Sequence, residues 1–356
     1  MRSAILSAAV GFMQLTPGHL PDKPGLLPDK RNGLNIFGDA IVRACINGIK
    51  KLSVFVAASV LAAGFSAGCA PMSRQTVPAP SAAARTVEVY VPVSTADGLA
   101  AEENEKAVID YSNASDGYVM VKYKEQTSNM LMTLIDAPNG EQYVYIMPCG
   151  EYAVLPLTEG DGRYVVTVCE QINDTKFKIT LKTYVDVTLT DPLSPFLRPS
   201  RYVNYNRDSE VVNEAVKLAA STGDLLGGIS AVYHFVTTNI VYDATLAKSV
   251  ESGYLPNLDE VLKTKKGICF DYAAVMTAML RCIGVPTKMV FGYTGDFYHA
   301  WISVYSEQEG WLDNVIFFDG NNWILMDPTF ASGENQSEAV AEYIGQGSNY
   351  SAKFHY

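Results

Sequence analysis

Between residues 86 and 190 the apolar residues alternate with polar ones in short runs, and turn residues separate these runs. Runs of this kind, rich in Val, Ile, Tyr and Thr, predict β-strands with one buried face. The expected strands span residues 87–91, 107–111, 118–123, 130–135, 143–147, 152–155, 164–168, 177–181 and 184–189. Strands at this spacing predict an antiparallel β-sandwich, Ig-like in general plan, over residues 86–190.

The apolar period changes to that of helices after residue 208. Amphipathic patterns predict helices over residues 210–220 and 224–239, and a short helix is expected over 258–262. The apolar run 269–283 suits a buried helix that Gly284 closes. Helices followed by strands predict an α+β domain, entered through the Pro-rich connector at 191–199 and extending to residue 356.

Two later segments read as strands. Residues 298–305 are aromatic and β-branched, and residues 323–327 form a second apolar run that Pro328 stops. Because a polar, Gly-containing connection joins them, the two strands can pair, which would bring His299 and Asp327 side by side. Beyond them, a helix is expected over residues 338–344 and an edge strand over residues 350–356.

The N-terminal 85 residues predict no packed domain. Residues 1–40 are Pro- and Gly-rich without an amphipathic period, so we expect them to be disordered or to precede the true start of the protein. Residues 41–69 combine a basic head, the apolar run 52–65 and small residues, which is typical of a secretory signal peptide. Residues 70–85 have the composition of a linker.

The signal peptide ends in Ser66-Ala-Gly-Cys69, which resembles a bacterial lipobox. In that case Cys69 would be lipidated and the protein would be anchored to the membrane outside the cytoplasm. The position three before the cysteine is Ser66 instead of the usual Leu. A plain signal peptide cut near Gly68 or Ala70, which gives a secreted protein, is the alternative.

Composition narrows the function classes. A net charge of −11 argues against binding to nucleic acid and against attachment to a membrane through a polybasic surface of the protein. The six cysteines include no CxxC pair and the four histidines are scattered, so we expect neither a metal site nor a cofactor. Cys149 and Cys169 flank an expected hairpin without lying opposite each other, so we expect two buried free thiols there.

Three residues of the C-terminal half suit nucleophilic catalysis. Cys269 opens its helix, where unpaired N–H groups and the helix dipole favour a thiolate, and the preceding Lys-Lys-Gly predicts an accessible position. His299 is the best candidate base by elimination, because the other histidines lie at the chain ends or inside a helical pattern. Asp327 would orient the imidazole. Each residue alone fits an ordinary core or turn position, so the prediction depends on the three together.

The motifs GICFDYAA, YHAWISVY and LMDPTF, which contain Cys269, His299 and Asp327, resemble those of transglutaminase-like domains, a papain-related superfamily. The resemblance covers roughly the last 150 residues, somewhat more than a compact domain needs. It implies a cysteine protease, an amidase or an acyltransferase with a Cys-His-Asp triad. It is to the compact bacterial branch described as cysteine proteases, and no acidic calcium loop is evident.

The resemblance also implies an oxyanion site formed by the backbone N–H of Cys269 and a side-chain donor upstream. Tyr242 and Asn239 are the candidates. All three tryptophans follow Cys269, a departure from animal transglutaminases that argues against crosslinking. The remaining cleft candidates are Asp271 and Tyr272, for which capping or packing is the alternative, and Trp301. Trp301 should share a strand face with His299, as a substrate wall or as core.

Two classes of function therefore compete. The first is an extracytoplasmic thiol enzyme that hydrolyses amide bonds of a peptide, a protein or peptidoglycan, or transfers the acyl group to an amine. The second is a surface binding module without catalysis. Because no triad residue is missing, the sequence favours the enzyme.

Overall fold

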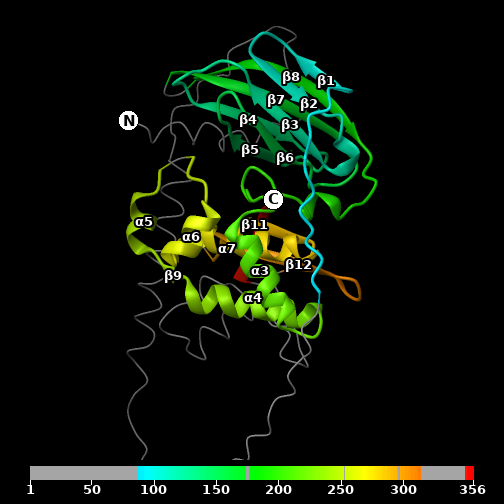
Figure 1. Cartoon of the computed structure of the whole chain (residues 1–356). Coiled ribbons are helices and arrows are strands. Elements are labelled where there is room, and N and C mark those ends of the chain that lie inside the picture. Colours follow the sequence, from blue (N-terminus) through cyan, green and yellow to red (C-terminus); the bar gives the residue numbers. More distant parts are fainter. Residues whose placement is uncertain (1–85, 174–175, 252, 296, 314–348) are drawn as a thin grey trace, which may run out of the picture.

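The computed structural model describes residues 86–173, 176–251, 253–295, 297–313 and 349–356 (Figure 1). Its strands are β1 Ala101–Glu103, β2 Ala107–Asp110, β3 Tyr118–Tyr123, β4 Leu131–Asp136, β5 Gln142–Ile146, β6 Tyr152–Pro156, β7 Gly162–Asn173, β8 Lys176–Val187, β9 Val241–Tyr242, β10 Lys266–Gly267, β11 Thr287–Thr294, β12 Phe297–Ser306, β13 Gly310–Leu312 and β14 Tyr350–His355. Its α-helices are α3 Glu210–Ala220, α4 Leu225–Asn239, α5 Ala244–Ser249, α6 Leu258–Thr264 and α7 Cys269–Cys282.

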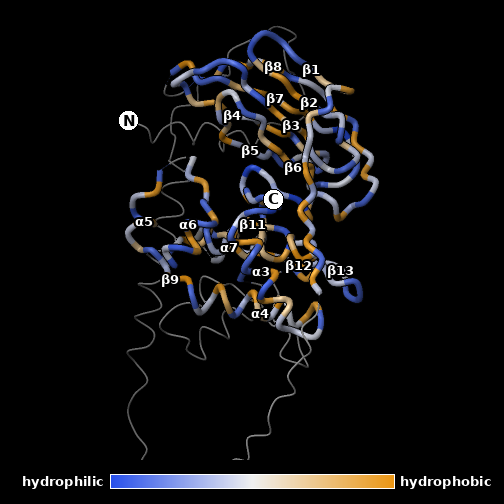
Figure 2. Tube along the Cα trace, viewed as in Figure 1, coloured by the Kyte–Doolittle hydropathy of each residue, from blue (hydrophilic) through white to orange (hydrophobic). Residues whose placement is uncertain are grey.

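The N-terminal part of the described chain contains two four-stranded antiparallel sheets. Their strand orders are β1-β2-β3-β6 and β5-β4-β7-β8. Alternate residues of both sheets, such as Ile109 and Val121 in one and Ile135 and Val166 in the other, are buried in a shared core. Figure 2 shows hydrophobic stretches along these strands. Antiparallel strands are therefore present at most of the predicted places, and the Ig-like plan stays a prediction.

Two strand predictions in this part are wrong in detail. Residues 87–91 are extended but join no sheet; Val87, Val89 and Val91 pack against the core, and the Tyr90 N–H donates to the Cys282 carbonyl at 2.8 Å. Alternation arises there because one side of the segment lies on the helical part. The two strands expected over 177–189 are one strand, β8, because the polar residues between the apolar runs continue the pairing with β7.

The helices begin and end close to the predicted residues. Helix α3 buries one face through Val211, Ala215 and Ala219, which recur at four-residue spacing. At the start of α4, the Asp224 side chain accepts a hydrogen bond from the Gly227 N–H at 2.7 Å. Helix α7 is followed by Gly284, whose φ of 85° lies in the left-handed region that closes many helices.

Helix α7 is the centre of the C-terminal part (Figure 1). It packs against β11 and β12 on one side and against α3, α4 and α6 on the other. All of its residues are buried, as its continuous apolar run predicts for a helix covered on every side. The sheet beside it has the order β13-β12-β11-β14 and is antiparallel throughout. Strand β14 lies at its edge, as predicted for residues 350–356.

Several short elements were not predicted. Strands β1, β9, β10, β11 and β13 and helix α5 have no counterpart among the expected elements, and residues 241–243, which read as irregular in the sequence, contain β9. The expected strand at 323–327 and helix at 338–344 lie outside the described residues, as do residues 1–85 with Cys69. Among the helices that the structure describes, none has both the length and the apolar character needed to cross a bilayer.

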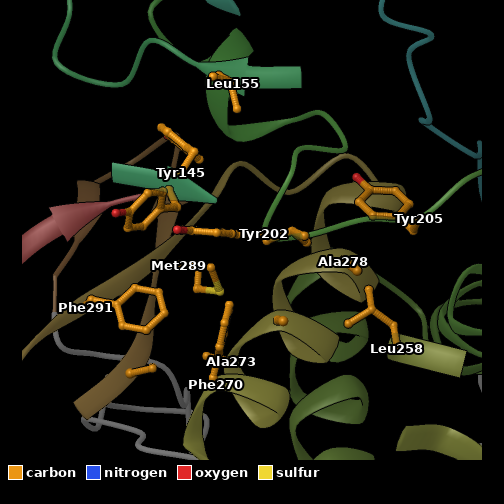
Figure 3. Packing of buried hydrophobic residues seen from close by; sticks show 14 of the residues in the cluster. Tyr145, Leu155, Tyr202, Tyr205, Leu258, Phe270, Ala273, Ala278, Met289 and Phe291 are labelled. Atoms are coloured by element: carbon orange, nitrogen blue, oxygen red, sulfur yellow. The ribbon is translucent and has the colours of Figure 1, made fainter. Parts of the chain in front are cut away.

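An aromatic cluster joins the β-rich part to the C-terminal sheet. The ring of Tyr356 lies 4.8 Å from that of Tyr202, 5.3 Å from that of Tyr143 and 5.5 Å from that of Phe291. Figure 3 shows Tyr145, Tyr202, Met289, Phe291 and Phe270 around this junction. The connector, the β-rich part and the sheet beside α7 therefore share one buried interior.

Arg281 is a buried cation held by backbone oxygens. Its guanidinium donates to the carbonyl of Thr287 at 2.8 and 2.9 Å, to that of Arg198 at 2.9 Å and to that of Tyr356 at 2.8 Å. Burial lowers the pKa of Arg281 to about 10, so it stays charged at neutral pH. The side chain ties α7 to the connector and to the end of β14.

Arg201 and Tyr202, which follow the connector, lie along β5, the outermost strand of its sheet. The Tyr202 hydroxyl donates to the Val144 carbonyl at 2.7 Å, and the Arg201 Nε donates to the Ile146 carbonyl at 3.0 Å. Two carbonyls of β5 thus receive hydrogen bonds from side chains instead of from another strand.

In the described part of the chain, Cys149, Cys169 and Cys282 form no disulfide. Cys149 and Cys169 form no bridge, as expected, although Cys149 is only half-buried. Burial raises the pKa of Cys169 and of Cys282 to about 12, so both are unreactive thiols at neutral pH.

Candidate active site

A short parallel strand pair fixes the chain just before Cys269. Strand β10 pairs with β9, so that Tyr242 lies opposite Gly267. The Asp243 N–H donates to the Gly267 carbonyl at 2.9 Å and the Val241 N–H donates to the Lys265 carbonyl at 2.8 Å. The residue that enters α7 is therefore held in place from the end of α4.

Cys269 is the first residue of α7, as predicted, but it is not accessible. Only 1% of its surface is exposed, and the neighbouring Ile268 and Phe270 are also buried. The polar Lys-Lys-Gly ends before the helix, whereas the helix start itself lies under the packing of α7 against its neighbours. A substrate can reach the sulfur only if residues that cover it move apart.

His299 lies in β12, opposite Gly292 of β11. Its ring lies 6.3 Å from the ring of Trp301 with 26° between the planes, so the two side chains share one strand face, as predicted. Tyr298 points to the other face and its ring lies 5.9 Å from that of Phe291. His299 is 3% exposed and Trp301 is 1% exposed. Trp301 packs in the interior instead of lining an open wall.

Gly292 is needed beside this pair. A Cβ atom at this position would lie 2.7 Å from the Cη2 atom of Trp301 and would overlap the carbonyl oxygen of Ser351. The Trp301 ring and strand β14 therefore both rest on the bare backbone of Gly292.

The structure brings the elements that carry Cys269 and His299 together. Helix α7 packs against β12. Burial raises the pKa of Tyr298 well above its usual value, and the Cys269 thiol is among the neighbouring groups that add to this rise. Cys269 thus lies near Tyr298, whose side chain points to the opposite face of β12 from that of His299, so this contact places the strand, and the pairing of the sulfur with the imidazole stays a prediction. Asp327 lies outside the described residues.

Asp271 caps the helix that Cys269 opens. Its Oδ2 accepts from the Ile268 N–H at 2.8 Å and its Oδ1 accepts from the Tyr254 hydroxyl at 2.7 Å. Burial raises the pKa of Asp271 to about 6, although both hydrogen bonds favour the carboxylate. Tyr272 is fully buried, and its hydroxyl donates to the Ile240 carbonyl at 2.6 Å. Capping and packing describe these two residues.

The two oxyanion candidates occupy different places. Tyr242 is half-buried and lies opposite Gly267, two residues before Cys269. Asn239 is exposed at the end of α4, where its amide donates to the Phe235 carbonyl at 2.9 Å and to the Thr238 Oγ1 at 3.1 Å. The position of Tyr242 suits the role better, and the assignment of either residue to an oxyanion stays a prediction.

Sequence reasoning missed Tyr254. It lies 17 residues before Asp271, in a segment without helical or strand periodicity, so no pattern points to the contact. The residues described by the structure contain no group of three or more His, Cys, Asp or Glu side chains arranged to hold a metal ion.

Residues 213–328 match a family model described as the transglutaminase-like superfamily. The chain is 28% identical to the kyphoscoliosis peptidase of Mus musculus over 137 residues, which cover 35% of this chain and 18% of that protein. It is 26% identical to a protein-glutamine gamma-glutamyltransferase of Pseudomonas aeruginosa over 109 residues, 26% of this chain and 14% of that protein. The matches thus span less than a fifth of either relative.

A crystal structure of red sea bream transglutaminase aligns with 64% of this chain and 53% of its own, at 12% identity and a TM-score of 0.28.

Proposed function

We propose, from the match of residues 213–328 to the transglutaminase-like family model, that this chain is a thiol-dependent acyl-transfer enzyme that hydrolyses amide bonds of peptides, proteins or peptidoglycan. The observation that carries the proposal is that Cys269, His299 and Asp327 all fall inside the matched residues. The position of Cys269 at the start of α7, packed against the strand of His299, supports it.

The proposed chemistry has two steps. The Cys269 thiolate attacks the amide carbonyl carbon, and the carbon–nitrogen bond breaks as His299 gives its proton to the leaving amine, which leaves a thioester on the sulfur. Water then attacks the thioester while His299 takes a proton, and a carboxylic acid and the free thiolate are released. Asp327 would hold the imidazole in the orientation that both transfers need.

The two relatives favour different acceptors for the acyl group. One is named a peptidase, which uses water, and the other a glutamyltransferase, which uses an amine. All three tryptophans of this chain follow Cys269, unlike the arrangement in animal transglutaminases. We therefore place hydrolysis first and transfer to an amine second.

Incubation with peptide and peptidoglycan-fragment libraries, with and without a primary amine, is expected to give products that mass spectrometry identifies as cleaved amides. Cys269→Ala should abolish them, because no thioester can then form. Products that carry the added amine would show that the enzyme transfers the acyl group to an amine instead of to water. If the wild-type protein and the Cys269→Ala variant gave the same product list, the chain would be a binding module.

We also propose that the enzyme acts outside the cytoplasm, tethered by a lipid on Cys69. The support is the sequence of residues 41–69, a basic head and apolar run that end in Ser-Ala-Gly-Cys. The intact mass of the mature protein from membranes is expected to correspond to a chain that begins at a diacylated Cys69. A mass that begins near Ala70 without lipid would indicate a secreted protein instead.

A further inference from the structure

The turn just before Cys269 is fixed by a hydrogen bond to the buried carboxylate of Asp271. Asp271 lies three residues after Ile268, and its Oδ2 accepts from the Ile268 N–H at 2.8 Å. Ile268, the residue before the helix, has no side-chain acceptor of its own, so Asp271 supplies the only half of a capping box that this turn can form. The N–H of Cys269 follows directly in the chain, so its direction depends on this contact.

Gly267 makes the close approach of Asp271 possible. A Cβ atom at residue 267 would lie 2.6 Å from the Cβ of Asp271 and 3.1 Å from its Oδ2. Any side chain there would push the carboxylate away from the Ile268 N–H. The Gly-Ile-Cys-Phe-Asp segment is thus a single unit in which the glycine, the thiol and the carboxylate are placed together.

Tyr254 completes the unit from a distant segment. Its hydroxyl donates to Oδ1 of Asp271 at 2.7 Å, and its ring lies 6.3 Å from that of Phe270. Burial raises the pKa of Tyr254, so the hydroxyl remains a donor at all physiological pH values. Next to Tyr254, Gly253 lies against Ile146 of β5. The β-rich part therefore supports the segment that supports Asp271.

Burial and its polar neighbours determine the pKa of Asp271. Asp243 adds to the rise of its pKa, and Tyr254 and the Ile268 N–H oppose it, while burial is the largest influence. With a pKa of about 6, the carboxyl group of Asp271 can gain or lose its proton near neutral pH. The positive end of the helix dipole lowers the pKa of a thiol in the first helical turn, whereas a carboxylate in the same turn raises it.

We propose that Asp271 and Tyr254 form a positioning pair that fixes the turn before Cys269 and, through the charge of Asp271, sets how readily the Cys269 thiol ionises. When Asp271 is neutral the helix dipole acts on the thiol unopposed. When Asp271 is ionised its negative charge disfavours a second negative charge on the sulfur of the same turn. The pair belongs to the proposed acyl-transfer site, and its role in catalysis rests on that proposed function.

The test is the pH profile of Cys269 alkylation by iodoacetamide, measured on the whole chain by mass spectrometry of the peptide that contains Cys269, so that alkylation of Cys45, Cys69 and Cys149 does not enter the profile. Cys169 and Cys282 contribute little, because burial raises the pKa of each to about 12. Asp271→Asn keeps an oxygen acceptor but removes the charge. We expect its profile to move about one pH unit lower, which makes alkylation about tenfold faster on the rising part, with the same plateau within about twofold.

Tyr254→Phe removes the donor that stabilises the ionised carboxylate, so its profile should move in the same direction by about half as much. Glu260→Gln, on the exposed side of α6, removes one negative charge from the same domain and should leave the profile in place. A folded Asp271→Asn or Tyr254→Phe variant with an unshifted profile would overturn the proposal, as would an equal shift in Glu260→Gln.

The two proposals fail in different ways. Alkylation needs no substrate, so an absence of amide cleavage would end the proposed function and leave the profiles interpretable. A profile that ignores Asp271 in an enzyme that does cleave amides would end only the positioning pair. Circular dichroism and the melting temperature of each variant establish that it is folded before its profile is used.

Discussion

Replacing His299 by alanine is expected to slow the alkylation of Cys269 about 100-fold at pH 6. A cysteine without a partner has a pKa near 8.5, so only about 0.3% of it is thiolate at pH 6. A thiolate paired with an imidazolium has a pKa lowered by several units and is mostly ionised at that pH. Loss of the imidazole would therefore remove most of the reactive form.

The measurement is the rate of iodoacetamide incorporation at pH 6, followed by mass spectrometry of the peptide that contains Cys269. Cys269→Ala sets the background from other thiols. His234→Ala is a matched control, because His234 is an exposed histidine of α4. It should react at the wild-type rate.

Because Cys269 is buried, part of the wild-type rate reflects the opening that exposes the sulfur. Opening affects wild-type protein and variant alike when both keep the same melting temperature. Equal alkylation rates in wild type and His299→Ala would contradict a thiolate–imidazolium pair, and a non-catalytic binding module would then be the better account of the chain.

The second large effect is expected from Arg281. Arg281→Ala should lower the free energy of unfolding by about 3–5 kcal/mol, because it leaves a cavity and removes the donors to buried carbonyl groups of Thr287 and Arg198. Arg281→Met fills much of the volume without restoring the donors, so it should lose less.

Urea denaturation followed by far-UV circular dichroism gives these values. Arg163→Ala provides the contrast, because Arg163 forms an exposed ion pair with Asp186 and its loss should leave the midpoint nearly unchanged. If Arg281→Ala unfolded at the same urea concentration as Arg163→Ala, the guanidinium would not be a structural centre of the domain.

The sequence predicts best those elements whose pattern is determined by local burial. Helices α3 and α7 each have a stripe or a continuous run that only one packing arrangement satisfies, and their predicted starts, Glu210 and Cys269, are the observed ones. The sequence predicts two strands where β8 is one, because Lys182 and Thr183 separate two apolar runs, whereas the pairing with β7 continues through them.

What the sequence could not predict depends on contacts between distant residues. The burial of Cys269 reflects the packing of six elements against α7, and the polar Lys-Lys-Gly that precedes the helix gives no sign of them. The hydrogen bond from Tyr254 to Asp271 likewise joins two segments, and the sequence pattern of neither one predicts the contact. The order Cys, His, Asp of the candidate triad follows from the three motifs alone. The position of Asp327 relative to His299 stays a prediction.

The side chains along β5 have a consequence for how the protein behaves among its own copies. The outermost strand of a sheet is normally a template on which a foreign strand can add through free backbone groups, the first step toward aggregation. With the carbonyls of Val144 and Ile146 already bound by Tyr202 and Arg201, that template is blocked in part by the segment that leads into the C-terminal part. A protein concentrated on a surface, with many copies at close quarters, would gain solubility from this arrangement.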